Sequence, residues 1–88
     1  MATIKIRYWA AAKQAAGIEE ETVNADTLAA AIAVVIAGHA GGDGRLAAVL
    51  ACSSFLIDGQ RAGNQAAAGA IALRDQQVIE VLPPFAGG

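Results

Sequence analysis

Hydrophobic and polar residues alternate strictly along the start of the chain. Ile4, Ile6 and Tyr8 form one side of the pattern, which is apolar. Lys5, Arg7 and Trp9 form the other side, which is largely basic. A period of two residues is typical of a β-strand with one buried face. The pattern therefore predicts a strand over residues 3–9 that turns its isoleucines toward the core.

A short helix and a second strand are expected next. Residues 10–16 favour helix and end at Gly17, a natural helix stop. Residues 19–23 return to β preference through Thr22 and Val23. The two strands flank a short connection, which predicts a hairpin with an elaborated turn.

The main helix is predicted to run from Leu28 to about His39. Either Asp26 or Thr27 can cap its N-terminus, because each offers a side-chain oxygen to an unpaired backbone N–H. Val34 lies off its apolar stripe. The stripe that faces the core consists of Leu28, Ile32, Val35 and Ile36.

Short elements are expected in the second half of the chain. Residues 45–51 resemble a short helix, and residues 55–57 a strand that enters a turn at Asp58-Gly59, a strong hairpin signal. Residues 60–62 can pair back on that strand. Residues 63–69 are small and polar, and are expected to form an irregular loop.

The final segment predicts two buried anchors, a turn and a last strand. The anchors are Ile71 and Leu73, the turn covers residues 74–77, and the strand over residues 78–82 is buried through Ile79 and Val81. Strands on both sides of one main helix predict an α+β domain, a mixed sheet covered on one face.

Composition narrows the possible functions. The chain has 88 residues, enough for one domain, and 23 of them are alanine, which buries little area. A net charge of −2 excludes an electrostatic nucleic-acid binder. One cysteine and one histidine exclude a disulfide framework and most zinc sites, so no metal is expected. The longest apolar run is too short for a membrane span, and the N-terminus reads as a strand, which favours a cytoplasmic protein.

Three polar features are interpreted as structural. Cys52 follows an apolar segment and is expected to be a small buried residue. His39 is expected to be solvated or to favour the helix dipole. The run Glu19-Glu20-Glu21 is expected to be a solvated strand edge.

The carboxyl end carries the most specific signal. Pro83-Pro84 directly after a strand stops its pairing and favours a stiff extended chain. Residues 83–88 could reach about 20 Å when extended. Gly87 and Gly88 have no Cβ, so they can thread a tunnel that would exclude any other residue. We therefore expect a body over residues 1–82 and a flexible diglycine tail that delivers the Gly88 carboxylate into a partner's active site.

The chain resembles the ThiS/MoaD family of β-grasp sulfur carriers, relatives of ubiquitin. The resemblance spans the chain and rests on the first strand (residues 4–10), the stop at Gly17, the central helix, the Asp58-Gly59 turn and the ending Val81-Leu82-Pro83-Pro84-Phe85-Ala86-Gly87-Gly88. Within the family, this ending and the length are similar to the small subunits of molybdopterin synthase. The family's Asp-Gly-Asp before the last strand is replaced here by Asp75-Gln76-Gln77.

The resemblance implies a ubiquitin-like β-grasp and a cycle at Gly88. An E1-like enzyme would adenylate the carboxylate with ATP, and sulfur transfer would give a thiocarboxylate. The large subunit of molybdopterin synthase would then accept the tail, and sulfur would pass to a pterin precursor of the molybdenum cofactor. The chain would bind no cofactor and would not be an enzyme alone. A carrier for thiamine thiazole or cysteine synthesis, a ubiquitin-like modifier and a plain interaction module remain alternatives.

The family's fold also predicts a docking patch. Its first and last strands lie side by side and parallel, so residue parity places Trp9 and Leu82 on the outer face beside Lys5, Arg7 and Glu80. An exposed tryptophan is a frequent interface anchor. Arg61 is expected to rim this patch, and Phe85 in the tail to contact the partner.

Overall fold

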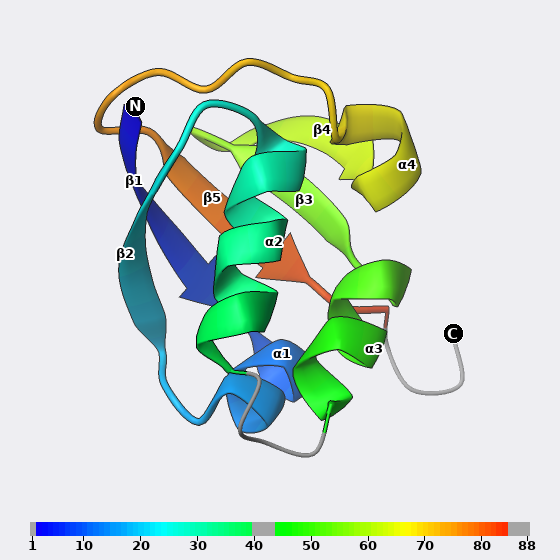
Figure 1. Cartoon of the computed structure of the whole chain (residues 1–88). Helices are drawn as coiled ribbons and strands as arrows, with labels where there is room; N and C mark the ends of the chain where they lie inside the picture. The colour runs from blue at the N-terminus through cyan, green and yellow to red at the C-terminus, as the bar shows by residue number, and fades with distance from the viewer. Residues whose placement is uncertain (1, 40–43, 85–88) are drawn as a thin grey trace.

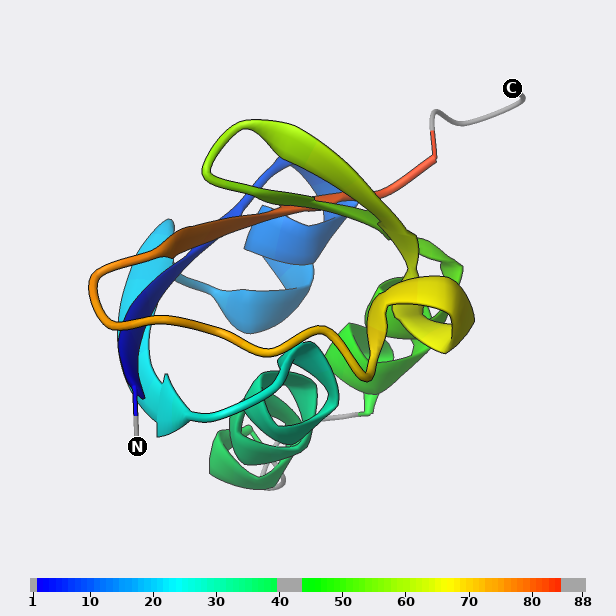
Figure 2. The same ribbon diagram turned by 90° about the horizontal axis from the view of Figure 1, so that it is seen from above.

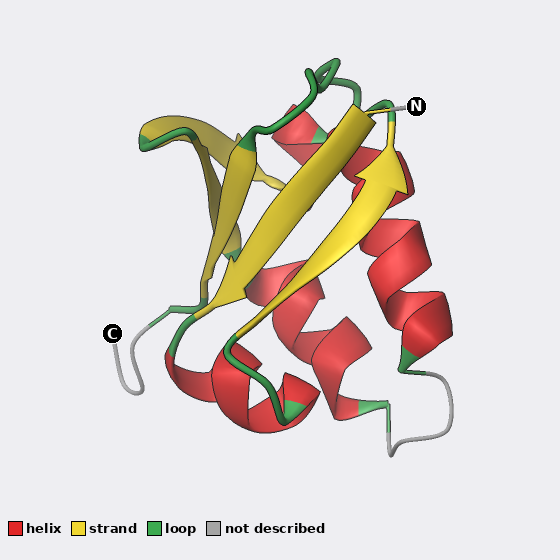
Figure 3. Ribbon diagram, turned by 90° about the vertical axis from the view of Figure 1, so that its left-hand side faces the viewer, coloured by secondary structure: helices red, strands yellow, loops and turns green. Residues whose placement is uncertain are grey.

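Five strands form one mixed sheet, and helices cover one of its faces (Figures 1 and 3). The computed structural model describes residues 2–39 and 44–84. In chain order the elements are β1 (Ala2–Tyr8), α1 (Ala10–Ala16), β2 (Glu20–Ala25), α2 (Leu28–Gly38), α3 (Arg45–Cys52), β3 (Ser54–Ile57), β4 (Gln60–Asn64), α4 (Gln65–Ala68) and β5 (Val78–Leu82).

The strand order is β2-β1-β5-β3-β4, so the first and last strands of the chain lie together at the centre. β1 pairs with β5 in parallel, with Ile6 opposite Ile79 and Arg7 opposite Glu80. The β1–β2, β3–β5 and β3–β4 pairs are antiparallel. The predicted α+β architecture and the parallel central pair are therefore confirmed.

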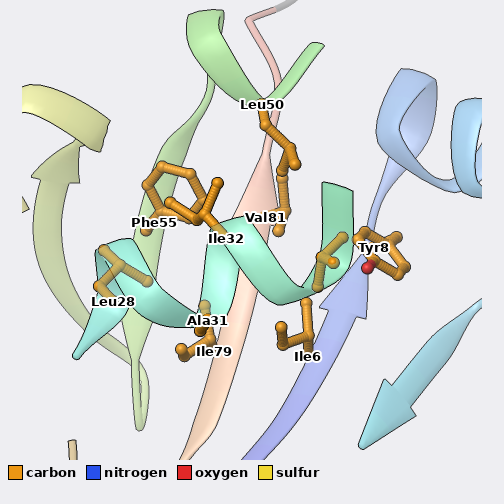
Figure 4. Close-up of a pocket in the computed structure, with 10 residues that line it drawn as sticks. Ile6, Tyr8, Leu28, Ala31, Ile32, Leu50, Phe55, Ile79 and Val81 are labelled. Carbon is orange, nitrogen blue, oxygen red and sulfur yellow. The ribbon is translucent and has the colours of Figure 1, made fainter. Parts of the chain in front are cut away.

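The core lies between the sheet and α2. Ile4, Ile6 and Tyr8 are buried, as the alternation of β1 predicted, and so are Ile79 and Val81 of β5. Figure 4 shows the side chains of Ile6, Tyr8, Ile79 and Val81 pointing toward α2 around a void of about 10 Å³. A void of this size in an apolar lining leaves no room for a ligand.

Helix α2 begins at a threonine cap. The Oγ1 atom of Thr27 accepts a hydrogen bond from the Ala30 backbone N–H at 3.1 Å, which decides between the two predicted caps. The helix buries Leu28, Ile32 and Val35, while Val34 is 43% exposed. The predicted stripe is thus correct, although Ile36 is only partly buried.

Left-handed backbone conformations occur in two turns, the β3–β4 hairpin turn and the turn before β5. Asp58 and Gly59 both have positive φ, +51° and +81°, which suits a tight hairpin between β3 and β4. Gln76, in the turn before β5, has a φ of +71°. In the Asp-Gly-Asp pattern of the family that the sequence resembles, this position is glycine.

Two expectations for residues 63–73 are wrong. Residues 63–69 are not an irregular loop: β4 continues to Asn64, and α4 follows because the Asn64 Oδ1 caps it by accepting from the Ala67 N–H at 2.8 Å. Ile71 is 38% exposed, whereas Leu73 is buried as predicted. The backbone of this segment is hydrogen-bonded to the start of α2, with Leu28 N–H donating to the Ile71 carbonyl, and of the two predicted anchors only Leu73 is part of the core.

Strand β5 ends at Leu82, and Pro83 and Pro84 carry the chain away from the sheet (Figure 2). The predicted tail residues Phe85, Gly87 and Gly88 lie outside the described residues.

Candidate functional site

The sheet face that points away from the helices is uncovered in the described part of the molecule (Figure 3). We call it the outer face. The register of the strands places one residue of each strand in a row across this face. In the order of the sheet, these residues are Glu20, Arg7, Glu80, Leu56 and Arg61. The outer face therefore combines acidic, basic and aliphatic side chains in one row across the sheet.

Trp9 lies over this row. Its ring is 41% exposed, and the Arg7 guanidinium lies 5.3 Å from the ring centroid, within cation–π distance. Its indole Nε1 donates a hydrogen bond to Glu80 Oε1 at 3.1 Å. Two contacts thus hold an exposed aromatic ring in one orientation on the outer face.

The basic residues of β1 pair with Glu20. The Lys5 Nζ and the Arg7 Nε atoms each lie 3.5 Å from a carboxylate oxygen of Glu20. Glu20 is exposed at the start of the edge strand β2, as the expected solvated edge requires, and antiparallel pairing also sets it opposite Arg7. All three side chains are well exposed, so each pair contributes little to stability, roughly 0–1 kcal/mol.

A groove of about 420 Å³ lies where the chain leaves the sheet. We call it the tail-root groove. Its lining includes Leu82, Pro83 and Pro84 from the end of β5, together with Arg61 and Cys52. Arg61 and Leu82, expected to share one patch, thus line the same groove.

Cys52 is exposed, so the expectation of a small buried residue is wrong. Helix α3 buries Leu46 and Leu50, which lie four residues apart on one face. Cys52 follows Leu50 by two residues, about 200° around the helix, and therefore points away from the core.

A separate hydrogen-bonded cluster lies on the helix side of the sheet. Glu21 Oε2 accepts from the Tyr8 hydroxyl at 2.6 Å and lies 2.9 Å from His39 Nε2. Burial, and then the Glu21 carboxylate, raise the pKa of the Tyr8 hydroxyl above its usual range. Glu21, expected to be solvated, is partly buried. Together with His39, which lies at the C-terminus of α2 where a helix-dipole role was one expectation, it ties β1 and β2 to the end of α2.

The chemistry available in the described residues is that of a binding surface. No group of three or more His, Cys, Asp or Glu side chains within residues 2–39 and 44–84 could hold a metal ion. Among those residues no helix has the length and hydropathy needed to cross a bilayer. The partner-binding residues predicted from the sequence, Trp9, Arg7, Lys5, Leu82 and Arg61, lie on the outer face or in the tail-root groove. Sequence reasoning missed Glu20, whose place opposite Arg7 could have been read from the hairpin pairing.

Solved structures share this architecture. The small archaeal modifier protein 1 from Methanosarcina acetivorans is 20% identical, with a TM-score of 0.80 over 100% of this chain and 98% of that one. The fold is a β-grasp. The protein of the same name from Haloferax volcanii superposes with a TM-score of 0.72 at 19% identity, over 99% of this chain and 100% of that chain.

A third β-grasp neighbour comes from a complex of subunits 1 and 2 of molybdopterin-converting factor from Helicobacter pylori. It is 21% identical, with a TM-score of 0.69 over 98% of this chain and 99% of that chain. No family model matches the sequence, and no curated protein is significantly similar to it. The ubiquitin-like β-grasp expected from the sequence is thus confirmed as a fold.

Proposed function

We propose that this β-grasp protein is a sulfur carrier that supplies sulfur for molybdopterin synthesis. The observation that carries the proposal is the path of the chain: the central strand β5 leads directly into Pro83-Pro84 and then into the sequence Phe85-Ala86-Gly87-Gly88. The likeness to a chain of the molybdopterin-converting factor complex supports the same role.

The proposed chemistry takes place at the carboxylate of Gly88. An E1-like enzyme transfers AMP from ATP to this carboxylate and releases pyrophosphate. A sulfide nucleophile then attacks the acyl carbon, the bond to AMP breaks, and a thiocarboxylate forms. Activation is needed because a carboxylate has no good leaving group, whereas the acyl adenylate has one.

The outer face and the tail-root groove are the surfaces that we assign to partners. Trp9 is the proposed anchor, since aromatic side chains held rigidly at a surface often dominate interfaces. Leu82, Arg61 and Phe85 would contact the partner near the tail. Lys5 and Arg7 would steer association through their charge. The partners are the E1-like enzyme and the large subunit of molybdopterin synthase.

Intact-mass measurement tests the carrier chemistry. The protein is incubated with an E1-like enzyme, ATP and sulfide, and the expected product has one oxygen replaced by sulfur. A variant that lacks Gly87 and Gly88 is the control, and it should neither change mass nor lose thermal stability. A full-length protein that stays unmodified with an enzyme active on another carrier would reject the proposal.

A second function, attachment to other proteins, is favoured by the likeness to small archaeal modifier proteins. Both functions begin with the same adenylate and differ in the nucleophile, which is a lysine amine for a modifier. Arg74 is the last basic residue, so trypsin would leave residues 75–88 on a modified lysine. Finding that remnant on cellular proteins would support the modifier function, whereas a free thiocarboxylate supports the carrier.

A further inference from the structure

A second groove lies far from the tail, beside the tip of the β3–β4 hairpin. It has a volume of about 340 Å³ and is bounded by the hairpin and by the segment that links α4 to β5. Residues that line it include Arg61, Ala62, Ile71, Ala72 and Arg74. We call it the hairpin groove. Arg61 lines both the hairpin groove and the tail-root groove, whereas Arg74 lines the hairpin groove and not the tail-root groove.

The hairpin groove carries two arginines whose side chains make no ion pair in residues 2–39 and 44–84. Asp58 also lines the groove, and its carboxylate oxygens accept from Gln77 Nε2 at 3.2 Å and from the Val78 N–H at 2.9 Å rather than from either arginine. Lys5 and Arg7 differ from these arginines, because both pair with Glu20. The two guanidinium groups, without ion pairs in the described residues, outweigh the single carboxylate of Asp58, so this concave surface has a net positive charge in a chain of net charge −2.

The groove also presents a rigid aliphatic contact. Ile71 is 38% exposed, one of the large hydrophobic side chains that the fold leaves at the surface. Its backbone is held on both sides, because its N–H donates to the Ala68 carbonyl at 3.0 Å and its carbonyl accepts from the Leu28 N–H at 3.1 Å. A partner that covers Ile71 would bury apolar area with little loss of backbone freedom.

We propose that the hairpin groove docks an acidic segment of a partner protein, with an aliphatic side chain of that segment placed over Ile71. Carboxylates are the complementary groups for paired arginines, because each guanidinium can donate two parallel hydrogen bonds to one carboxylate. Ala62 and Ala72 also line the groove, and their small side chains leave room for an aliphatic side chain of the partner.

The position of the hairpin groove makes this contact independent of the tail. Strand β5 begins beside the groove at Val78 and ends at Leu82, and the chain then leaves the opposite end of the sheet (Figure 1). A strand of this length spans roughly 13 Å between its end residues. A partner held at the groove would therefore leave residues 83–88 accessible.

A titration of the full-length protein with the synthetic peptide Glu-Glu-Leu-Glu-Glu, followed by amide chemical shifts, tests the proposal. The expected shifts fall on the hairpin tip and on residues 71–77. Arg74→Glu should weaken binding about ten-fold, the effect of losing one charge-assisted contact. Lys13→Glu is the matched control, since it makes the same charge change at an exposed site outside the groove and should leave the affinity unchanged.

Ile71→Ser separates the aliphatic contact from the charges and should also weaken binding. The proposal is overturned if a Gln-Gln-Leu-Gln-Gln peptide binds equally well, or if Lys13→Glu weakens binding as much as Arg74→Glu does. It is also overturned if inorganic phosphate alone shifts the same residues at equal concentration, which would define a simple anion site. None of these outcomes depends on Gly88, so the sulfur-carrier proposal is tested separately.

Discussion

Gln76 has a backbone conformation that normally belongs to glycine. Its φ is +71°, and its N–H donates to the Thr3 carbonyl at 2.8 Å, so the turn holds the residue in place. A side chain in the left-handed region costs about 1 kcal/mol. The turn before β5 thus forms with glutamine, at a cost in stability that glycine would avoid.

Replacing Gln76 with glycine should raise the melting temperature by a few degrees, since about 0.5–1 kcal/mol corresponds to roughly 2–8 °C in a domain of this size. Differential scanning calorimetry measures the change. Gln77→Gly is the control and should lower the melting temperature, because Gln77 Oε1 accepts from the Arg74 N–H and its Nε2 donates to Asp58. Equal destabilisation by both changes would contradict the strain argument.

Tyr8 should link stability to alkaline pH. The folded state raises the pKa of its hydroxyl, through burial and the bond to Glu21, so the neutral form is favoured by folding. This stabilisation is complete below the unfolded pKa of about 10 and is lost as the pH rises above it. Tyr8 is the only tyrosine, so tyrosinate absorbance reports this residue alone.

We expect no tyrosinate absorbance above pH 10 until the protein unfolds, and then a step that coincides with the loss of circular dichroism. Tyr8→Phe removes the titrating group and should flatten the alkaline decline, although it also loses the hydrogen bond to Glu21. A reversible titration near pH 10 in the folded protein would show that Tyr8 is accessible.

At the scale of single elements, α2 depends on its threonine cap. Thr27→Ala should destabilise the domain by about 1 kcal/mol, because the Ala30 N–H loses the Thr27 Oγ1 acceptor. Asp26→Ala is the matched control at the neighbouring position. Among residues 2–39 and 44–84, Asp26 bonds only through its backbone carbonyl, which accepts from the Leu73 N–H, so this change should be nearly neutral. Urea unfolding compares the two, and a larger effect of Asp26→Ala would mean that the cap is wrongly assigned.

Elements with a clear hydrophobic period were predicted well, and so was the alanine-rich helix α1, whereas residues 63–69 were not. β1 and β5 alternate large apolar residues with polar ones, and their buried faces agree with the structure. Residues 63–69 contain only small and polar side chains, so no hydrophobic period predicted α4 or the last two residues of β4. Alanine favours a helix, but a run of alanines does not show which face of the helix is buried. The capping residue Asn64 was the feature of the sequence that could have predicted where α4 begins.

At the scale of the whole molecule, the two faces of the sheet should respond differently to truncation. Ile6 lies within β1 and is 3% exposed, whereas Trp9 directly follows β1 and is 41% exposed. Ile6→Ala should cost about 2–5 kcal/mol of stability through lost burial and a cavity. Trp9→Ala should cost less than about 1 kcal/mol, since it loses only surface contacts with Arg7 and Glu80.

Paired measurements of melting and of affinity for the large synthase subunit check this contrast. Trp9→Ala should weaken binding by roughly thirty-fold, the effect of removing an interface anchor worth about 2 kcal/mol. If Trp9→Ala lowered stability as much as Ile6→Ala, the ring would belong to the folded core instead. If it left the affinity unchanged, the outer face would not be the docking surface.

Local pattern in the sequence was sufficient for the α+β class, the buried faces of β1, α2 and β5, and the Asp58-Gly59 turn. Each of these depends on residues a few positions apart, and backbone geometry relates such residues directly. The roles expected for the tail and the outer face stay predictions, because they concern partners.

Only the tertiary structure decided the contacts between distant residues. Glu20 and Glu21 are neighbours in the sequence, yet one pairs with Lys5 and Arg7 on the outer face and the other with Tyr8 and His39 on the helix side. The exposure of Cys52 and Ile71 was equally hidden, since it depends on which side of a short element meets the core. Hairpin pairing could have placed Glu20 opposite Arg7, but the contact of Glu21 with His39 depends on how α2 packs against the sheet, which no spacing along the chain encodes.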